Sequence, residues 1–568
     1  MHAARRALTV MDCGMDLLPY WRDRERFVVF DADWGDGAAF SAWVEAWRGD
    51  PRRPARLHVI AIARGELPGF RRMLPPLQRD PAITLDLLHA PVEAALAQLE
   101  ARFDAVHLHG LNNAGSGFAR ALARLLAKNA VLHADRLSAQ QTAALAATGW
   151  VFDGAQSARY ASRKPFAPIA PAPQRRAIVL GAGLAGAAAC QRLCARGWDV
   201  TLVERHPQAA MEASGNLAGI TMPLLSKDDN IASRLSRAAY LFALDYWHRL
   251  GGVGEAIEGA RCGVLLVAKD AAHAGLQRAI AGARTLPPWY AEWFDSEAAA
   301  ARYGTLAPHG AWLFPQGGWI RPASACQAML DACGPGLERR FGVGSVGLER
   351  SGDEWRVVDA AGAIIAQAPT VIVANGAGAS QLAQAAFLPL TRVRGQVTHL
   401  DADASDLPPN LGLVLCREAY LTPAFGGVRS AGASYDDDDD PALRMSSQQQ
   451  NLDKLRSMLG NPAIGIDAPL RGRVGVRSVA PDRLPLVGAL PDPAFPIGAE
   501  RLRELPRQGG LYALLGYASR GLTWAPLAAE LLAARLEGEP LPLETGLADA
   551  LDPGRFQLRR RRGQSRPA

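Results

Sequence analysis

A glycine-rich turn, GAGLAG, carries the clearest chemistry in this sequence, because its spacing suits the binding of a diphosphate. Gly181 permits a tight turn after a strand, Gly183 lets the backbone approach a pyrophosphate, and Gly186 allows a helix to pack closely on that strand. Glu204 follows where an acid accepts hydrogen bonds from the ribose hydroxyls of adenosine and repels a 2′-phosphate. The pattern predicts a dinucleotide site and leaves FAD and NAD both open.

The elements that must hold this turn surround it in the sequence. Residues 175–205 read as strand, turn, helix and second strand, which is a nearly complete βαβ unit. Downstream, the apolar runs in 261–269, 355–362 and 395–403 predict an inserted antiparallel sheet on the substrate side of the cofactor. The C-terminal part therefore reads as a Rossmann-type α/β domain with an inserted antiparallel, β-rich substrate domain.

A second α/β region precedes this one. The apolar runs in 27–37, 57–63 and 103–110 are separated by helix-length segments, which predicts a parallel sheet in a Rossmann-like domain. A proline- and alanine-rich stretch, KPFAPIAPAPQRR, separates the two regions. We therefore expect an N-terminal domain at 1–165, a linker at 166–174, a C-terminal domain at 175–557 and a basic tail at 558–568.

The composition is that of a globular protein, with 49% hydrophobic and 21% charged residues among 568. The net charge is +6 and the pI about 9.0, so an anionic partner is permitted. The run Arg559 to Arg562 reads either as a phosphate-binding element or as a solvated tail, and composition alone favours the tail. The acidic run Asp436 to Asp440 predicts an exposed loop.

Several features of the sequence bear on the subcellular location of the protein. The apolar stretch at the N-terminus is cut short by Asp12, so we expect no signal peptide, and no run of about 18 apolar residues predicts a membrane span. Seven dispersed cysteines do not resemble a secreted disulfide framework, and Cys190 and Cys194 are expected to be core thiols. A cytoplasmic protein is the expectation.

Six sequence blocks follow the glycine turn in order through 175–557: EASGNLAGITMPLLSKDDN, FPQGGWIRPA, VIVANGAGAS, RVRGQVTHL, GVRSVAPDRLPLVGALPD and LGYASRGLTWAPLAAELLA. Together they resemble the FAD domain of the MnmC family of bifunctional tRNA-modifying enzymes, and more broadly the glycine and D-amino-acid oxidases. The resemblance implies FAD as the cofactor, tRNA as the partner, and oxidative removal of the carboxymethyl arm from 5-carboxymethylaminomethyluridine at the wobble position, leaving an aminomethyl group.

The resemblance implies roles on the substrate side. Arg477 matches the position where related amine oxidases hold the substrate carboxylate, and its alternative is an ion pair with nearby Asp482. Tyr420 is either a hydroxyl facing the substrate or a core aromatic. Both residues are taken as candidate catalytic residues.

It also implies further contacts to the cofactor. Ser214, Gly215 and Asn216 are small or polar and would let the backbone approach FAD closely. Arg520 and Gly521 are expected at the turn into the last long helix, whose amides would face the flavin, with a plain capping turn as the alternative.

The N-terminal domain resembles the family's S-adenosylmethionine-dependent methyltransferase only faintly. Asp31, Gly35 and Gly37 match the family's pattern. Asp33, however, occupies the position of the family's first loop glycine, where its side chain would crowd S-adenosylmethionine. Ala63 replaces the ribose-binding acid, unless Glu66 reaches in, and His109 replaces an acid at the acceptor amine. We therefore predict a degenerate methyltransferase fold in which S-adenosylmethionine is a doubtful cofactor. One hypothesis for its retention is that it presents basic surface to tRNA or braces the oxidase.

His107 and His109 alternate along a predicted strand and share one face. A metal site needs a third ligand, and the sequence does not indicate one, so no metal is predicted. Three functions remain in competition: an oxidase of tRNA with or without methyl transfer, an oxidase of small amines or amino acids, and an RNA-binding flavoprotein without catalysis. Reduction of the flavin by tRNA, by free glycine or by neither would separate them.

Overall fold

The computed structural model describes residues 15–73, 82–110, 115–162, 171–409, 411–494 and 499–558. The chain divides into two compact units. Unit 1 comprises Met1–Pro173 together with Ala534–Ala548, and unit 2 comprises Gln174–Ala533 together with Asp549–Ala568. Among the described residues, no helix combines the length and apolar character needed to cross a membrane.

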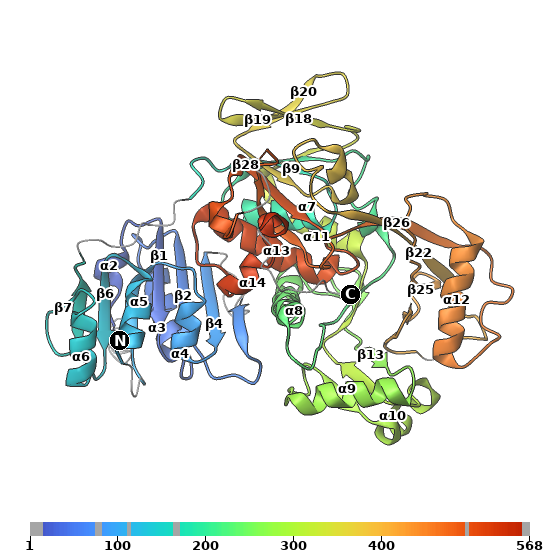
Figure 1. The fold of residues 1–568 in the computed structure, drawn as a ribbon, viewed down its shortest axis with the longest axis horizontal. Helices are drawn as coiled ribbons and strands as arrows, with labels where there is room; N and C mark the ends of the chain where they lie inside the picture. The colour runs from blue at the N-terminus through green and yellow to red at the C-terminus, as the bar shows by residue number, and fades with distance from the viewer. Residues whose placement is uncertain are drawn as a thin grey trace. The chain divides into compact units, whose positions relative to one another are not determined.

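Unit 1 is built on an eight-stranded sheet in the order β3-β4-β2-β1-β5-β6-β8-β7 (Figure 1). The five central strands, from β4 to β6, run parallel, whereas β3, β8 and β7 pair antiparallel to their neighbours. The strands are β1 (Arg26–Asp31), β2 (Arg56–Ile62), β3 (Gly69–Met73), β4 (Ile83–His89), β5 (Phe103–Leu108), β6 (Leu126–Ala134), β7 (Trp150–Phe152) and β8 (Ser157–Tyr160).

Helices bury both faces of this sheet. Along β1, Phe27 and Val29 pack with residues of one helix, and Val28 and Phe30 pack into a second core cluster on the opposite face. Burial on both faces explains why the strands are continuous apolar runs rather than alternating ones. The helices are α2 (Leu18–Trp21), α3 (Ala38–Gly49), α4 (Val92–Ala97), α5 (Ser116–Ala123) and α6 (Ala139–Ala146).

Unit 2 begins with the expected βαβ unit. β9 (Arg176–Leu180), α7 (Leu184–Cys194) and β10 (Asp199–Val203) open a six-stranded sheet in the order β17-β10-β9-β21-β28-β27. All pairs in this sheet are parallel except β27 with β28. Its other strands are β17 (Leu337–Arg340), β21 (Thr370–Val373), β27 (Leu486–Pro491) and β28 (Arg507–Leu515).

A second eight-stranded sheet, in the order β14-β15-β13-β23-β24-β25-β22-β26, forms the inserted domain. Its pairs are antiparallel except β13 with β23. The strands are β13 (Val264–Val267), β14 (Glu292–Phe294), β15 (Ala311–Phe314), β22 (Thr391–Asp401), β23 (Val414–Cys416), β24 (Tyr420–Leu421), β25 (Val428–Gly432) and β26 (Gly472–Val479). The α/β class and the inserted β-rich domain are confirmed.

One apolar run lies elsewhere than expected. The segment 355–362 contributes β19 (Glu354–Val358) to a separate three-stranded sheet with β18 (Gly347–Ser351) and β20 (Ile364–Ala368), visible as the yellow hairpins in Figure 1. A further small sheet joins β11 (Gly219–Thr221), β16 (Gly318–Ile320) and β12 (Gly259–Ala260). The apolar pattern of 355–362 identifies a strand, but it does not identify the strand's partner.

Helices complete unit 2, and the last long one crosses the division between the units. α13 begins in unit 2, and its residues from Ala534 onward are grouped with unit 1. The helices of unit 2 are α8 (Ile231–Arg249), α9 (Ala271–Ala283), α10 (Ser296–Tyr303), α11 (Pro322–Asp331), α12 (Met445–Leu459) and α13 (Gly521–Glu537). The short α14 (Thr545–Asp549) lies, except for Asp549, in the segment grouped with unit 1.

Candidate active site

A cavity of about 400 Å³ lies in unit 2 where the six-stranded sheet meets the inserted sheet. The carboxyl ends of β9, β10, β21 and β28 supply one side of it, and residues of β22 to β26 supply the other. In open α/β sheets, ligands bind outside the carboxyl ends of the strands. The cavity therefore has the position and size of a ligand site.

The glycine-rich turn borders this cavity and leaves no room for side chains. Gly181 has a φ of +100°, and a Cβ there would lie 2.8 Å from the Asn375 Cα. A Cβ on Gly183 would lie 2.9 Å from Ser214 Oγ, and one on Gly186 would overlap the Gly181 carbonyl oxygen. Gly181 and Gly183 line the cavity, whereas Gly186 lies behind them and permits close packing of α7 on β9.

Glu204 follows β10, and its carboxylate is held by two backbone hydrogen bonds. Its Oε2 accepts a hydrogen bond from the Ala182 N–H at 2.7 Å, and its Oε1 accepts one from the His206 N–H at 2.9 Å. The side chain is buried and lines the cavity. The carboxylate is thus fixed beside the glycine turn, where the ribose of a dinucleotide would lie.

The Ser214 to Asn216 segment faces the start of α7. Ser214 Oγ accepts from the Leu184 N–H at 3.1 Å, and both Ser214 and Asn216 line the cavity. Gly215 does not line it. A Cβ on Gly215 would overlap Arg473, whose Nη2 donates to the Met211 and Glu212 carbonyl oxygens at 2.6 Å each.

Arg477 lies on β26 and lines the cavity from the inserted sheet. Its side chain is buried, and its Nη1 donates to the Ser434 carbonyl oxygen at 3.2 Å. The expected alternative partner, Asp482, instead pairs with Arg555 at 2.8 Å. Among the described residues no carboxylate pairs with Arg477, so a buried cation faces the cavity without a counter-ion, an arrangement that favours binding of an anion.

Tyr420 lies on β24 and lines the same cavity as Arg477. Burial raises the pKa of its hydroxyl, and the nearby Arg477 lowers it by less. The phenol is therefore neutral at neutral pH and retains its proton for donation. Tyr420 therefore lines the cavity rather than lying in a purely apolar core, and its role toward a substrate stays a prediction.

Arg520 and Gly521 lie at the start of α13. The Arg520 carbonyl oxygen accepts from the Thr523 and Trp524 N–H groups, each at 3.0 Å, and thereby caps the helix. Its guanidinium donates to the Met222 carbonyl oxygen at 3.3 Å, and burial lowers its pKa. Both residues line the cavity, so this turn caps the helix and also borders the ligand site.

The sequence analysis assigned no role to four further residues that line the cavity. Asn375, Ser478 and Tyr517 line the cavity, and among the described residues the Asn375 Oδ1, Ser478 Oγ and Tyr517 hydroxyl are buried without a hydrogen-bond partner. Tyr435 stacks on the Arg477 guanidinium at 4.4 Å and is 60% exposed. Unpaired polar atoms around a glycine-lined cavity fit a large polar cofactor such as FAD.

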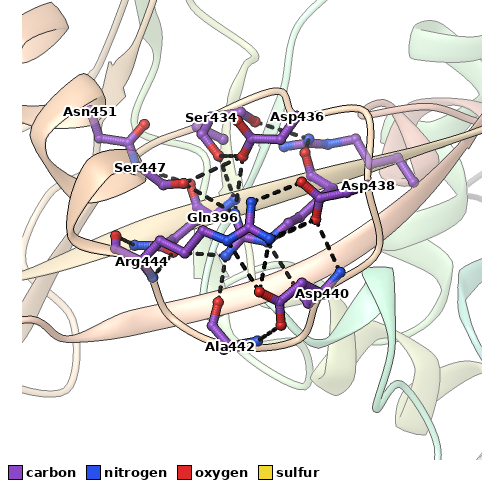
Figure 2. Close-up of polar contacts among 12 residues, drawn as sticks. Gln396, Ser434, Asp436, Asp438, Asp440, Ala442, Arg444, Ser447 and Asn451 are labelled. Carbon is purple, nitrogen blue, oxygen red and sulfur yellow. Dashed lines mark hydrogen bonds and ion pairs between the residues drawn. The ribbon is translucent and has the colours of Figure 1, made fainter.

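The loop after β25 is organised by two arginines (Figure 2). Arg394 is buried and donates to Asp436 Oδ2 at 3.0 Å and to the Asp440 carbonyl oxygen at 2.8 Å. Arg444 pairs with Asp438 and Asp440, each at 2.8 Å. The acidic run is therefore only partly exposed, because alternate carboxylates turn inward to these arginines, and the fixed loop carries Ser434 and Tyr435 next to Arg477.

The altered positions of unit 1 lie at the carboxyl ends of its strands. Asp33 points at Gly110, whose added Cβ would lie 2.5 Å from Asp33 Oδ2, so the carboxylate fills the space between the loops after β1 and β5. Ala63 is buried directly after β2, and Glu66 is exposed. His109 Nε2 lies 2.8 Å from Asp31 Oδ1, so the retained acid contacts the substituted position.

Comparison with known proteins places these features in context. The family described as FAD dependent oxidoreductase matches residues 176–535. A protein of Azoarcus sp. (strain BH72), described as tRNA 5-methylaminomethyl-2-thiouridine biosynthesis bifunctional protein MnmC, is 39% identical over 96% of this chain and 92% of its own length. The protein of the same description from Aromatoleum aromaticum (strain DSM 19018 / LMG 30748 / EbN1) is 39% identical over 98% of this chain and 94% of its own length.

Solved structures share the fold at lower identity. Glycine oxidase from Geobacillus kaustophilus aligns with a TM-score of 0.55 and 19% identity, covering 67% of this chain and 99% of that protein. L-proline dehydrogenase from P.horikoshii aligns with a TM-score of 0.55 and 19% identity, covering 68% and 99%. These likenesses establish the fold.

Proposed function

Because this chain belongs to the MnmC family of bifunctional tRNA-modifying proteins and carries its FAD-dependent oxidoreductase domain, we propose that the cavity of unit 2 oxidises a modified wobble uridine of tRNA. The substrate is the 5-carboxymethylaminomethyl group. The carbon between amine and carboxylate loses a hydride and the amine loses a proton, which gives an imine. Addition of water then releases the two-carbon arm as an aldehyde acid and leaves the aminomethyl group.

FAD, when bound, supplies the acceptor for that hydride. Gly181 and Gly183 give the pyrophosphate access to the backbone, and the start of α7 directs its N–H groups toward it. The Glu204 carboxylate accepts hydrogen bonds from the ribose hydroxyls, and its negative charge disfavours a 2′-phosphate. Arg520 and Gly521 also border the cavity, where the first turn of α13 offers N–H groups to the flavin ring.

The observation that carries the substrate assignment is the buried Arg477 guanidinium without a described carboxylate partner. A substrate carboxylate beside Arg477 completes a charge-assisted pair and orients the adjacent carbon for hydride loss. Tyr420 presents a neutral hydroxyl in the same cavity, which suits a hydrogen bond to the substrate amine or carboxylate. Tyr435 covers the Arg477 guanidinium from the exposed side.

Methyl transfer, the second activity in the name of the relatives, is proposed to be lost in this chain. Asp33 fills the space beside Gly110, and Ala63 offers no carboxylate for a ribose. The final product is therefore the aminomethyl nucleoside. A tRNA substrate also supports a cytoplasmic location.

The test is to incubate the protein with tRNA carrying the carboxymethylaminomethyl group, with and without S-adenosylmethionine, and to measure nucleoside masses. Loss of the carboxymethyl mass without later methyl gain is expected. A methyl gain that requires S-adenosylmethionine would refute the loss of methyl transfer. Flavin reduction by free glycine or sarcosine as fast as by tRNA would favour a small-molecule oxidase.

Two variants make this test specific to the site. Arg477→Met is expected to lower kcat/KM by roughly 100-fold or more, because losing charge-assisted hydrogen bonds costs about 3 kcal/mol. Arg356→Met is the matched control, since Arg356 contacts Gln367 on the separate small sheet and does not line the cavity. Equal activity of the two variants would contradict the role of Arg477.

A further inference from the structure

Unit 1 contains a cluster of imidazoles and carboxylates that the oxidase does not use. Asp31 is the last residue of β1, His107 lies near the end of β5, and His109 follows that strand. The parallel register places Asp31 opposite His107, and His107 opposite His133 on β6. Three adjacent strands thus present their chemical groups at one edge of the sheet.

This edge is the point at which the strand order reverses. From β1 the chain moves outward to β2 and β4, and it then returns to the other side of β1 to form β5 and β6. In open α/β sheets the crevice at such a switch point is where ligands bind. Asp31 and the two histidines occupy the two strands that flank it.

The donor atoms of these three residues converge. His107 Nδ1 lies 3.2 Å and His109 Nε2 lies 2.8 Å from Asp31 Oδ1, and the three atoms all lie within 4.8 Å of one another. Ligands around a tetrahedral zinc ion lie roughly 3.3 to 3.6 Å apart, given metal bonds of about 2.0 to 2.2 Å. Small movements of the side chains would therefore admit an ion.

Hydrogen bonds do not satisfy every polar atom of Asp31, His107 and His109. Both imidazoles approach the same oxygen of Asp31, and His107 Nε2 is buried without a hydrogen-bond partner among the described residues. The His107 side chain is only 4% exposed and packs edge-on against Trp43 at 5.5 Å. This packing holds the ring with Nδ1 toward Asp31, although Nε2 has no second-shell partner among the described residues.

We propose that Asp31, His107 and His109 bind one divalent transition-metal ion of the zinc type. Two imidazoles and one carboxylate are the ligands that such ions prefer, whereas Mg²⁺ and Ca²⁺ prefer oxygen alone. The side chain of His109 is 23% exposed, so the ion keeps an open position toward solvent for water or a further ligand. The site depends on unit 1 alone and is independent of the proposed oxidase.

The experiment uses tag-free, full-length protein that has been treated with chelator. Zn²⁺ binding is measured by calorimetry, and Co²⁺ is added as a spectroscopic probe, whose visible ligand-field bands report nitrogen and oxygen coordination. We expect one Zn²⁺ per chain and a Zn²⁺-dependent rise in melting temperature. His109→Ala is expected to weaken binding by at least about 100-fold and to remove the Co²⁺ bands.

His248→Ala is the matched control, because His248 is an exposed histidine in unit 2 outside this cluster. It should bind Zn²⁺ as the parent chain does. Asp31→Asn should behave like His109→Ala, and far-UV circular dichroism shows whether that buried variant folds. Absence of stoichiometric binding, or equal binding by His109→Ala and His248→Ala, would mean that the three residues form only a hydrogen-bonded group and would overturn the proposal.

Discussion

At the scale of single residues, the position of Arg477 depends on a glycine across the strand pair. Gly395 on β22 pairs with Gly475 on β26, and a Cβ on Gly395 would overlap the Arg477 guanidinium. The guanidinium therefore lies flat against bare backbone, with Tyr435 on its other side. The sequence RGQ shows a glycine at position 395. The packing of β22 against β26 shows that this glycine leaves room for the Arg477 guanidinium.

Gly395→Ala is accordingly expected to displace the Arg477 guanidinium rather than to unfold the protein, because the obstructing atoms are the end of a flexible side chain. We expect kcat/KM to fall by roughly 10-fold or more, since displacement by about 1 Å is costly for orientation, while FAD content stays unchanged. Steady-state kinetics and the flavin absorbance ratio measure the two effects. Gly412→Ala is the matched control, because its Cβ would meet nothing within 4 Å.

At the scale of elements, the loop that follows β25 depends on one buried arginine. Arg394 reaches from β22 to Asp436, Ser447 and Gln396, with distances of 3.0, 3.1 and 3.1 Å. These contacts tie the loop and the start of α12 to the sheet. Because Ser434 and Tyr435 lie on this loop, its stability and the geometry around Arg477 are linked.

Arg394→Met is expected to destabilise unit 2 by about 3 to 5 kcal/mol, because removal of one partner leaves buried polar groups unpaired. Arg392→Met, two residues earlier on the same strand, removes an ion pair with Asp439 in which both side chains are about half exposed, at 43% and 53%. Arg392→Met should lower the free energy of unfolding by less than about 1 kcal/mol. Thermal unfolding followed by flavin fluorescence compares them, and similar losses would contradict this account of the loop.

At the scale of the whole molecule, the division of the chain does not follow a single cut. Residues Ala534–Ala548, far downstream of the linker, belong to unit 1. Glu539 pairs with Arg56 at 2.7 Å, Arg72 donates to the Pro540 carbonyl oxygen at 2.7 Å, and the Leu541 N–H donates to the Glu100 carbonyl oxygen at 3.1 Å. The N-terminal unit thus includes a segment that follows the oxidase in sequence.

A chain that begins at residue 174 is therefore expected to be less stable and more prone to aggregate than the full protein, because its segment 534–548 loses these partners. Co-expression of residues 1–173 should restore solubility and melting temperature. Light scattering and differential scanning fluorimetry provide the readouts. A truncated chain as stable as the parent would show that unit 1 is dispensable for the fold of the oxidase.

Features that depend on nearby residues or on periodicity can be predicted from the amino-acid sequence. The turn at Gly181 to Gly186 spans six positions, and its chemistry follows from the backbone freedom of glycine. Apolar runs identified several strands of the three larger sheets, and the resemblance to one family indicated FAD and the amine chemistry, which the comparisons confirm.

Contacts between residues far apart in the sequence became clear from the three-dimensional arrangement of the strands. Asp31 joins His107 and His109 across 76 and 78 residues, Asp482 pairs with Arg555 rather than Arg477, and segment 534–548 lies within unit 1. These contacts are set by strand register and topology, which local sequence does not encode. For that reason most residues that the sequence proposed for the cofactor line one cavity, although Gly186 and Gly215 do not, whereas the third member of the histidine cluster came only from the alignment of β1 with β5.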